Sequence, residues 1–442
     1  MPFRSVAAPG RHPQDRVIFA LAIPALGALA ADPLYSLIDT AFVGHLGTPQ
    51  LGALAIGTAA FTASFWLFSF LAYGVTPRVA RSLGAMDGHA AGRTGVQALF
   101  LALAIGAVVT AAGVAFAHPV VRILGATDAV EEFATPYLRI RMLAAIPVLV
   151  AQVGHGWLRG AQDTRTAMYV AAAGASTNVV LDYLFIYPLG WGVEGAAWAT
   201  VVAQTAAAGT FWSILARRIH GITWRPDWVE MRSLIRVGID LAVRTGSLLA
   251  AMTFATAVAA RMGTIELASW QIAMQIFLLL AFTMDSLAIA GQALVGRYLG
   301  AADAERASDV GKRLVGLGIL LGVVLLVALV VTADSVARLF SGDPQVVRQA
   351  SLLLMWIAIL QPLSAVAFTL DGILLGASDT RFLAASMLGS SCLYAGLAAA
   401  ALRLGWGLPG LVFGATCWLA ARAMTTGWRF VRGRWASVYS SY

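Results

Sequence analysis

Charged residues are scarce in this 442-residue sequence. Asp, Glu, Lys and Arg make up 12% of it, about half of the roughly 25% typical of soluble domains. Cysteine is scarcer still, because only two residues are present, which excludes a disulfide-rich secreted scaffold. Hydrophobic residues reach 59%, and the mean hydropathy is +0.78. A soluble core cannot bury that much apolar surface, so the composition excludes a soluble enzyme and a disordered chain and indicates a membrane protein.

Long apolar stretches alternate with short polar or Gly/Pro-containing breaks along the whole chain. Each stretch has about the 20 residues that a bilayer crossing needs, and nothing resembles alternating strands. The sequence therefore predicts an all-α polytopic membrane protein with twelve transmembrane helices. We expect the spans near residues 17–44, 51–74, 93–117, 133–156, 167–187, 193–215, 233–260, 267–292, 312–334, 346–372, 383–403 and 407–430.

The 30 lysines and arginines are divided unevenly between the two sets of loops. Most of them fall in the N-terminal segment, in alternate loops, in the segment 216–232 and in the C-terminal tail. The positive-inside rule then places both termini in the cytoplasm. The net charge of +8 therefore reflects topology, and we expect no nucleic-acid partner. Because residues 1–16 are polar and the following apolar run is too long for a cleavable signal, we expect a multi-pass protein of the plasma (inner) membrane.

An internal repeat is visible at an offset of 216 residues. GWLRGAQDTR (Gly156–Arg165) matches GILLGASDTR (Gly372–Arg381), and RSLGAMD (Arg81–Asp87) matches RYLGAAD (Arg297–Asp303) at the same offset. The chain is therefore predicted to consist of an N-terminal lobe (1–215), a basic cytoplasmic linker (216–232) and a C-terminal lobe (233–442), with six helices in each lobe. Six is an even number, so the two lobes share one orientation in the membrane. Parallel repeats of this kind are typical of alternating-access transporters, whereas a duplicated scaffold or receptor is the alternative.

Several ionisable residues lie inside the expected spans, where they are costly and mark function. Asp32, Tyr35 and Asp39 share one face of the first helix because of their i, i+3, i+7 spacing. Pro24 and Pro33 fall in the same helix, and each removes a backbone hydrogen-bond donor. A kinked helix that carries buried carboxylates is a plausible moving part.

A second group of polar residues lies in the fifth and sixth spans. Asn178 and Asp182 are four residues apart on one helix face, and Thr200 adds a hydroxyl at a similar depth. At the repeat offset, alanines replace both Asp39 and Asp182 in the second half. Because the second half has the same fold without these acids, we predict a site in the N-terminal half.

Such a cluster suits reversible binding of a cation. Burial favours the protonated form of a carboxylic acid, and neighbouring carboxylates tend to share one proton. Carboxylate, amide and hydroxyl oxygens also suit a small hard cation. The residue types leave proton and sodium coupling both open.

The second half carries its own ionisable residues within spans. Asp240 and Arg244 have the i, i+4 spacing of an ion pair within one helix. Asp285 and Asp371 have no evident partner in the sequence, and we expect them either to neutralise a cationic substrate or to tune helix packing.

Four segments resemble the multidrug and toxic compound extrusion (MATE) family. They are SLIDTAFVGHLGTPQLGALAIG (Ser36–Gly57), GWLRGAQDTRTAM (Gly156–Met168), STNVVLDYLFI (Ser176–Ile186) and AFTMDSLAIAGQALVGRYLG (Ala281–Gly300), the last of which is most similar to the DinF branch. The resemblance implies two lobes around a central cavity and export of organic cations or other amphiphiles against an inward proton or sodium flow. It places the cation site at Asp39, Asn178, Asp182 and Thr200, the substrate cavity at Tyr35, Tyr137 and His155, and a bending proline at Pro24.

The expected transporter has no cofactor besides its coupling ion, and we expect a monomer in the lipid bilayer. His155 stands where the resemblance leads us to expect an amide, so it adds either a titrating group or a hydrogen-bonded cavity lining. Asp32, Asp285 and Asp371 complete the predicted substrate cavity. The DinF-like character favours protons. A sodium-coupled transporter and a lipid-linked flippase of the same superfamily are the alternatives, while an intramembrane enzyme is disfavoured because its characteristic motifs are missing.

Overall fold

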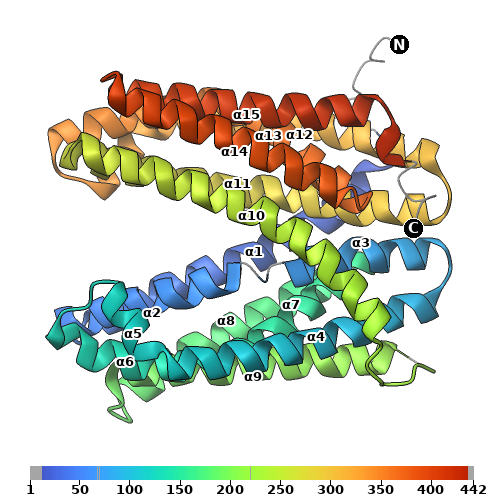
Figure 1. The fold of residues 1–442 in the computed structure, drawn as a ribbon, viewed down its shortest axis with the longest axis horizontal. Coiled ribbons are helices and arrows are strands. Elements are labelled where there is room, and N and C mark those ends of the chain that lie inside the picture. The colour runs from blue at the N-terminus through green and yellow to red at the C-terminus, as the bar shows by residue number, and fades with distance from the viewer. Residues whose placement is uncertain (1–11, 67, 69, 220, 437–442) are drawn as a thin grey trace. The chain divides into compact units, whose positions relative to one another are not determined.

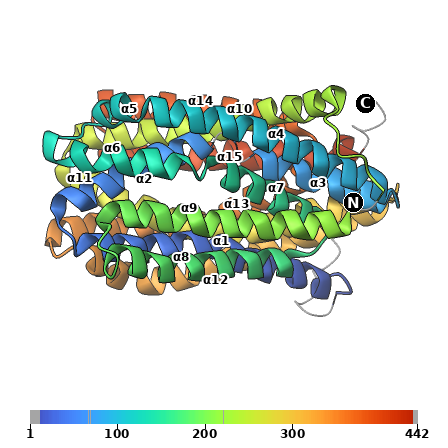
Figure 2. The same cartoon turned by 90° about the horizontal axis from the view of Figure 1, so that it is seen from below.

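The computed structural model describes residues 12–436 except 67, 69 and 220. The described chain is almost entirely helical (Figures 1 and 2). In chain order its helices are α1 (Asp15–Gly44), α2 (Thr48–Trp66), α3 (Phe70–Gly84), α4 (Gly88–Ala115), α5 (Ala117–Ile123), α6 (Asp128–Met142), α7 (Ala145–Gly160), α8 (Thr164–Ile186), α9 (Gly192–Arg218), α10 (Trp228–Met262), α11 (Thr264–Gly300), α12 (Ala304–Phe340), α13 (Pro344–Gly376), α14 (Thr380–Arg403), α15 (Gly407–Val431) and the 3-10 helix η2 (Arg434–Ala436).

The expected spans coincide with these helices. Ten helical segments are long and apolar enough to cross a membrane, and α2 with α3 counts as one of them. The pair α6 and α7, bent by 47° at the break between them, makes an eleventh, and α15 lies on the twelfth expected span. The described residues contain no strand. The prediction of an all-α polytopic fold is confirmed.

The chain divides into two compact units. The N-terminal unit comprises residues 23–238, and the C-terminal unit comprises residues 239–442 together with residues 1–22. The predicted boundary between the lobes was the linker 216–232, but the N-terminal unit extends to residue 238. The first turns of α10 pack on this unit, where Arg78 donates to the Ser233 carbonyl at 2.9 Å. The beginning of α1 instead belongs with α12, since Asp15 accepts two 2.7 Å hydrogen bonds from Arg313.

Glycines set the closest helix contacts in the N-terminal unit. A Cβ atom on Gly156 of α7 would come within 2.7 Å of the Ala72 carbonyl oxygen of α3, and one on Gly160 within 2.6 Å of the Thr76 carbonyl oxygen. A hydrogen bond also joins the two helices, because the Thr76 hydroxyl donates to the Gly156 carbonyl at 3.0 Å. Small residues four apart are the usual means of bringing membrane helices this close.

The C-terminal unit repeats this contact at equivalent positions. Gly372 and Gly376 of α13 meet the backbones of Ala288 and Gln292 of α11, and all four residues lie 216 positions after their N-terminal counterparts. The internal repeat is therefore a repeat of packing as well as of sequence.

Four turns between helices share the sequence Gly-Ala-x-Asp, with the variable residue at Met86, Gln162, Ala302 and Ser378. Each variable residue has φ near +60° and is not a glycine. The Asp N–H that follows bonds a carbonyl five residues back, as between Asp87 and Ser82 at 2.8 Å, which is the Schellman arrangement of a helix C-terminus. Each turn ends one helix, and the aspartate starts the next.

The aspartates of these turns hold neighbouring helices in place. Asp163 accepts from the Thr166 N–H at 3.1 Å, which caps α8, and from Arg218 of α9 at 2.7 Å. At the equivalent position of the C-terminal unit, Asp379 accepts from Arg429 of α15 at 2.6 Å. The turn aspartates therefore cap helices and form ion pairs.

Replacing Met86 by glycine is expected to stabilise the protein by up to about 1 kcal/mol, because a side chain disfavours the left-handed conformation. Met86 is 92% exposed, so little packing is lost. Thermal unfolding in detergent measures the change. Glycine at exposed Ala104, inside α4, is the control and should destabilise by about 1 kcal/mol; a lower unfolding temperature for Met86→Gly would contradict the argument.

The charge of Asp163 is expected to contribute stability only above its ordinary pKa. Burial raises the pKa of this carboxyl, but the hydrogen bonds from Thr166 and Arg218 outweigh burial, and the net pKa lies below the ordinary value of 3.8. A group with a lowered pKa stabilises the fold above its ordinary pKa, and the stability is lost as pH falls through the lowered value. Asp163→Ala should therefore lower the free energy of unfolding by about 1 kcal/mol at neutral pH. The difference between wild type and variant should stay constant down to pH 5 and shrink below pH 4, as measured by unfolding in detergent.

Candidate cation and substrate site

The predicted cation-site residues come from three helices of the N-terminal unit: α1, α8 and α9. Asp39 lies on α1, Asn178 and Asp182 on α8, and Thr200 on α9. All four are buried, and Asp182 is 0% exposed. Their positions on facing helix surfaces follow from the i, i+4 spacing on α8 and from the packing of α8 on α9.

Asn178 joins the two helices by its side-chain amide. Oriented so that each amide atom meets a complementary group, the amide nitrogen donates to Asp182 Oδ2 at 3.0 Å, and the amide oxygen accepts from the Thr200 backbone N–H at 3.2 Å. The Thr200 hydroxyl donates to the Ala196 carbonyl at 3.1 Å. One carboxylate oxygen of Asp182 is thus held in place.

The remaining carboxylate oxygens are without partners. Asp39 Oδ1 and Asp182 Oδ1 are buried and accept no hydrogen bond. The two carboxyl groups are close enough to interact electrostatically. A buried, unpaired carboxylate oxygen carries a desolvation cost, which binding of a proton or another cation would remove.

A pocket in the N-terminal unit gathers three of the six predicted substrate residues and two residues of the predicted cation site. Asp32 and Tyr35 of α1, His155 of α7, Asn178 and Thr200 all line it. Asp32 is exposed, while Tyr35 and His155 are half-buried. Asn178 and Thr200 of the predicted cation site therefore line one pocket with Asp32, Tyr35 and His155, whereas Asp39, Asp182 and Tyr137 are not among its lining residues.

Two glutamines and a phenylalanine of this pocket were missed from the sequence. Gln152 precedes His155 by three residues and Gln204 follows Thr200 by four, so both lie on the same helix faces as predicted residues, and this spacing was the signal that could have found them. The His155 ring packs against Phe211, with ring centroids 4.6 Å apart. Its Nδ1 is buried without a hydrogen-bond partner, so the fully bonded cavity lining considered for His155 is not observed.

Arg141 is the most important residue that sequence reasoning missed. Its side chain lies in the last turn of α6, is only 7% exposed and interacts electrostatically with Asp39 and Asp182. Tyr137, one helical turn earlier, is buried, and its hydroxyl lies 3.5 Å from the Thr58 hydroxyl. Arg141 falls within the expected span 133–156, but nothing in the local sequence indicates that it interacts with acids of two other helices.

Pro24 lies within α1, two residues after the point where the chain enters the N-terminal unit. Pro33 follows in the same helix. The helix that carries Asp32, Tyr35 and Asp39 therefore includes both prolines.

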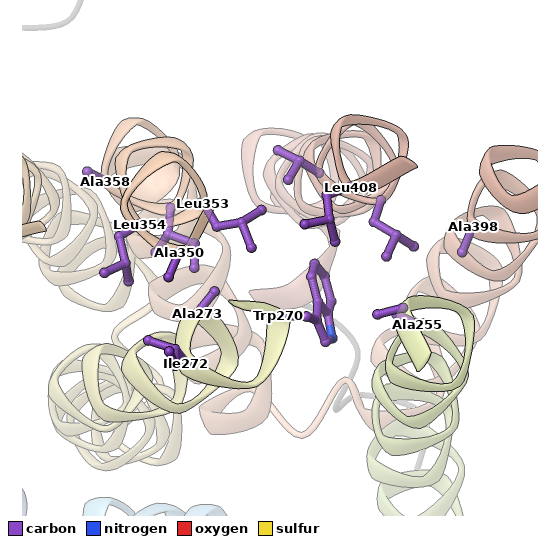
Figure 3. Close-up of a cluster of buried hydrophobic side chains, with 14 of the residues drawn as sticks. Ala255, Trp270, Ile272, Ala273, Ala350, Leu353, Leu354, Ala358, Ala398 and Leu408 are labelled. Atoms are coloured by element: carbon purple, nitrogen blue, oxygen red, sulfur yellow. The ribbon is translucent and has the colours of Figure 1, made fainter. Parts of the chain in front are cut away.

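At the positions equivalent to the cation site, the C-terminal unit has an apolar core. Ala255 and Ala398 stand in place of Asp39 and Asp182, and Tyr394 in place of Asn178; all three are buried in one hydrophobic cluster. Figure 3 shows the Trp270 indole close to Ala255 within this cluster. Tyr394 stacks on Trp418 with ring centroids 5.8 Å apart. Apolar packing in one unit thus replaces polar groups in the other.

The acids of the C-terminal unit are held by partners that the sequence did not indicate. Arg244 does not pair with Asp240, so that prediction is wrong. Arg244 reaches α13 instead and donates to Asp371 Oδ2 at 2.9 Å, while Asp240 accepts from the Thr380 hydroxyl at 2.8 Å. Arg422, which falls within the expected span 407–430, is 2% exposed and also donates to Asp371 Oδ2, at 2.8 Å.

Asp371 is therefore neutralised by two arginines, which favours the packing interpretation over a free substrate-binding carboxylate. Asp285 is half-buried on α11 in the same unit. Both belong to a different unit from the pocket that holds Asp32, Tyr35 and His155.

A model of the MatE family matches residues 24–184 and 247–399, one segment in each half of the repeat. Protein DETOXIFICATION 44, chloroplastic, from Arabidopsis thaliana is 32% identical over 443 residues, which covers 96% of this chain and 84% of that protein. DNA damage-inducible protein F of Escherichia coli (strain K12) is 30% identical over 430 residues, which covers 94% and 92%.

Solved structures share the fold. A MOP superfamily transporter from Pyrococcus furiosus superposes with a TM-score of 0.86 at 23% identity, over 100% of both chains. A MATE structure in the bent conformation superposes with a TM-score of 0.86 at 24% identity, over 96% of this chain and 95% of that chain. The family model covers most of both halves and the Arabidopsis relative nearly the whole chain, so this protein belongs to the MATE family of multi-pass membrane transporters.

Proposed function

We propose that this protein is a proton-coupled antiporter that exports cationic or amphipathic organic compounds by alternating access between its two repeat-related halves. One observation carries the proposal. Asp39 and Asp182 are buried carboxyl groups, each with an oxygen that has no partner, and their neighbours Asn178 and Thr200 line a pocket of about 90 Å³. Groups of this kind bind and release cations, since the charged form is costly without one.

Protons are favoured over sodium by the direction of the Asn178 amide. The amide meets complementary groups when its nitrogen donates to Asp182 and its oxygen accepts from Thr200, and in that orientation it offers no oxygen to an ion at the carboxylates. Sodium requires several oxygen ligands at once, whereas a proton needs one carboxylate oxygen. Sodium-driven efflux is the second candidate, because two carboxylates and the Thr200 hydroxyl still lie close together.

A cationic cargo is supported by the lining of the pocket. Asp32 is the only charged residue among the described residues that line it, and Tyr35, His155 and Phe211 supply aromatic surface. Aromatic faces and a carboxylate suit an organic cation. A flippase for a large anionic headgroup would instead need several cationic residues along its cavity, and none of the described residues that line this pocket is a lysine or an arginine.

Neutralising either carboxylate is expected to lower proton-driven efflux by about tenfold or more. A coupling ion shifts a conformational equilibrium only if it binds the two states with different affinity, and a site without its carboxylate no longer binds the ion. The full-length protein is reconstituted in liposomes, and export of rhodamine 6G, a fluorescent lipophilic cation, is measured under imposed proton or sodium gradients for wild type, Asp39→Asn and Asp182→Asn.

Asp334→Asn is the matched control, because Asp334 is an acid whose side chain is 62% exposed on α12. It should transport like wild type. Unchanged efflux in both Asp39→Asn and Asp182→Asn would refute the site, and efflux driven by sodium but not by protons would refute proton coupling.

We also propose that both termini and the linker 216–232 face the cytoplasm of a plasma-membrane protein. The arginine-rich loops support this orientation. After Cys392 and Cys417 are replaced by serine, a cysteine at exposed Leu189, between α8 and α9, should react with a membrane-impermeant maleimide in intact cells. A cysteine at Arg225 should react only after permeabilisation, and the reverse pattern would overturn the orientation.

A further inference from the structure

Arg141 combines a permanent charge with a buried position beside the cation site. It ends α6, and its guanidinium carbon lies 4.5 Å from the centre of the Phe61 ring on α2. Arginine stays protonated in proteins, so the charge cannot be removed by titration. The face of an aromatic ring stabilises a guanidinium only partly, and the remaining compensation must come from negative groups.

Three carboxyl groups, those of Asp32 and Asp39 on α1 and of Asp182 on α8, interact electrostatically with Arg141. The other titratable groups of this neighbourhood are Tyr35 of α1, Tyr137 of α6 and, through Asp32, Arg159 of α7. The guanidinium also interacts with the Tyr35 hydroxyl, and Tyr35 lines the pocket.

This cluster contains buried hydrogen-bond donors and acceptors that have no partner. Arg141 Nε and Nη1 are buried and donate to nothing, while Asp39 Oδ1 and Asp182 Oδ1 are buried and accept from nothing. Donors and acceptors that lie close together in a low-dielectric interior and remain unpaired are costly. The guanidinium of Arg141 therefore contacts Phe61 and interacts with Tyr35, and it does not form an ion pair with either carboxylate.

We propose that Arg141 is the built-in counter-cation of Asp39 and Asp182, a positioning residue that takes the place of the coupling ion. When the carboxyl groups release their protons, the free N–H groups of Arg141 pair with them. When protons return, the guanidinium is displaced to Tyr35 and Phe61. This inference rests on the proposed antiport function and extends it, because it explains how the site empties without leaving two uncompensated charges.

The chain offers a matched control two residues away. Arg139 lies on the same helix turn but is exposed, so Arg139→Gln removes an equal charge without touching the cluster. Arg141→Lys keeps the charge, and Arg141→Gln removes it. Tyr35→Phe takes away the hydroxyl that holds the guanidinium and leaves Arg141 free to pair with the carboxylates.

The experiment measures binding of rhodamine 6G to the detergent-solubilised full-length protein by fluorescence polarisation between pH 5 and pH 9. Protons compete with the cationic probe, so wild type should bind only above a midpoint pH. Removing a neighbouring positive charge makes a carboxylate hold its proton more tightly. The midpoint should therefore move up by about one pH unit or more in Arg141→Gln, stay near wild type in Arg141→Lys and Arg139→Gln, and move down in Tyr35→Phe.

The outcomes separate the inference from the function on which it rests. If wild type shows no pH-dependent binding and no proton-driven efflux, the proposed function fails. If wild type shows both and Arg141→Gln keeps the wild-type midpoint, the counter-cation role alone is overturned. If Arg141→Gln does not fold, the midpoint pH of Tyr35→Phe tests the proposal instead. A lower midpoint supports it, and an unchanged or higher midpoint in Tyr35→Phe overturns it. Equal shifts in Arg139→Gln and Arg141→Gln would also overturn it, since a general change of surface charge would then account for both.

Discussion

A charge inside an apolar helical bundle must be paired or neutralised, and the rest of this structure depends on how each unit meets that requirement. The C-terminal unit pairs Asp371 with Arg244 and Arg422 and fills the remaining core with alanine and aromatic side chains. The N-terminal unit leaves oxygens of Asp39 and Asp182 without partners. The first arrangement compensates its carboxylate with fixed arginines, whereas the second is the arrangement that the proposed cation binding would compensate.

The duplication shows which features belong to the fold and which to the site. Gly156 and Gly160 recur as Gly372 and Gly376 with the same backbone neighbours, and the four Gly-Ala-x-Asp turns recur with the same backbone conformation. These positions determine helix approach and helix ends, so both halves need them. Asp39, Asn178 and Asp182 do not recur, although their helices do. Helix packing therefore tolerates alanine at the acidic positions, and the acids must be explained by what they bind.

Sequence periodicity was sufficient for the spans, the repeat and the residues that share one helix face, because these depend on helix geometry alone. Contacts between helices could not be predicted in the same way. The i, i+4 rule paired Arg244 with Asp240, but a long arginine side chain reaches another helix as easily as the next turn of its own, and α13 offers a more buried carboxylate in Asp371. Arg141 escaped notice for the same reason, since its partners lie on α1 and α8.

In the proposed mechanism, the coupling ion acts on α1, because this helix carries Asp39. Pro24 and Pro33 each leave one carbonyl of that helix without its usual N–H donor, so α1 bends at a lower cost than a helix with all of its hydrogen bonds. Asp32, Tyr35 and Asp39 lie on the same helix, and protonation of Asp39 changes the charge that α1 presents to Arg141. In the proposed cycle, loss of that charge releases the guanidinium to Tyr35, which lines the pocket. Proton binding and ligand binding would then act on the same helix through Arg141, and two ligands that act on one conformational equilibrium in this way are coupled.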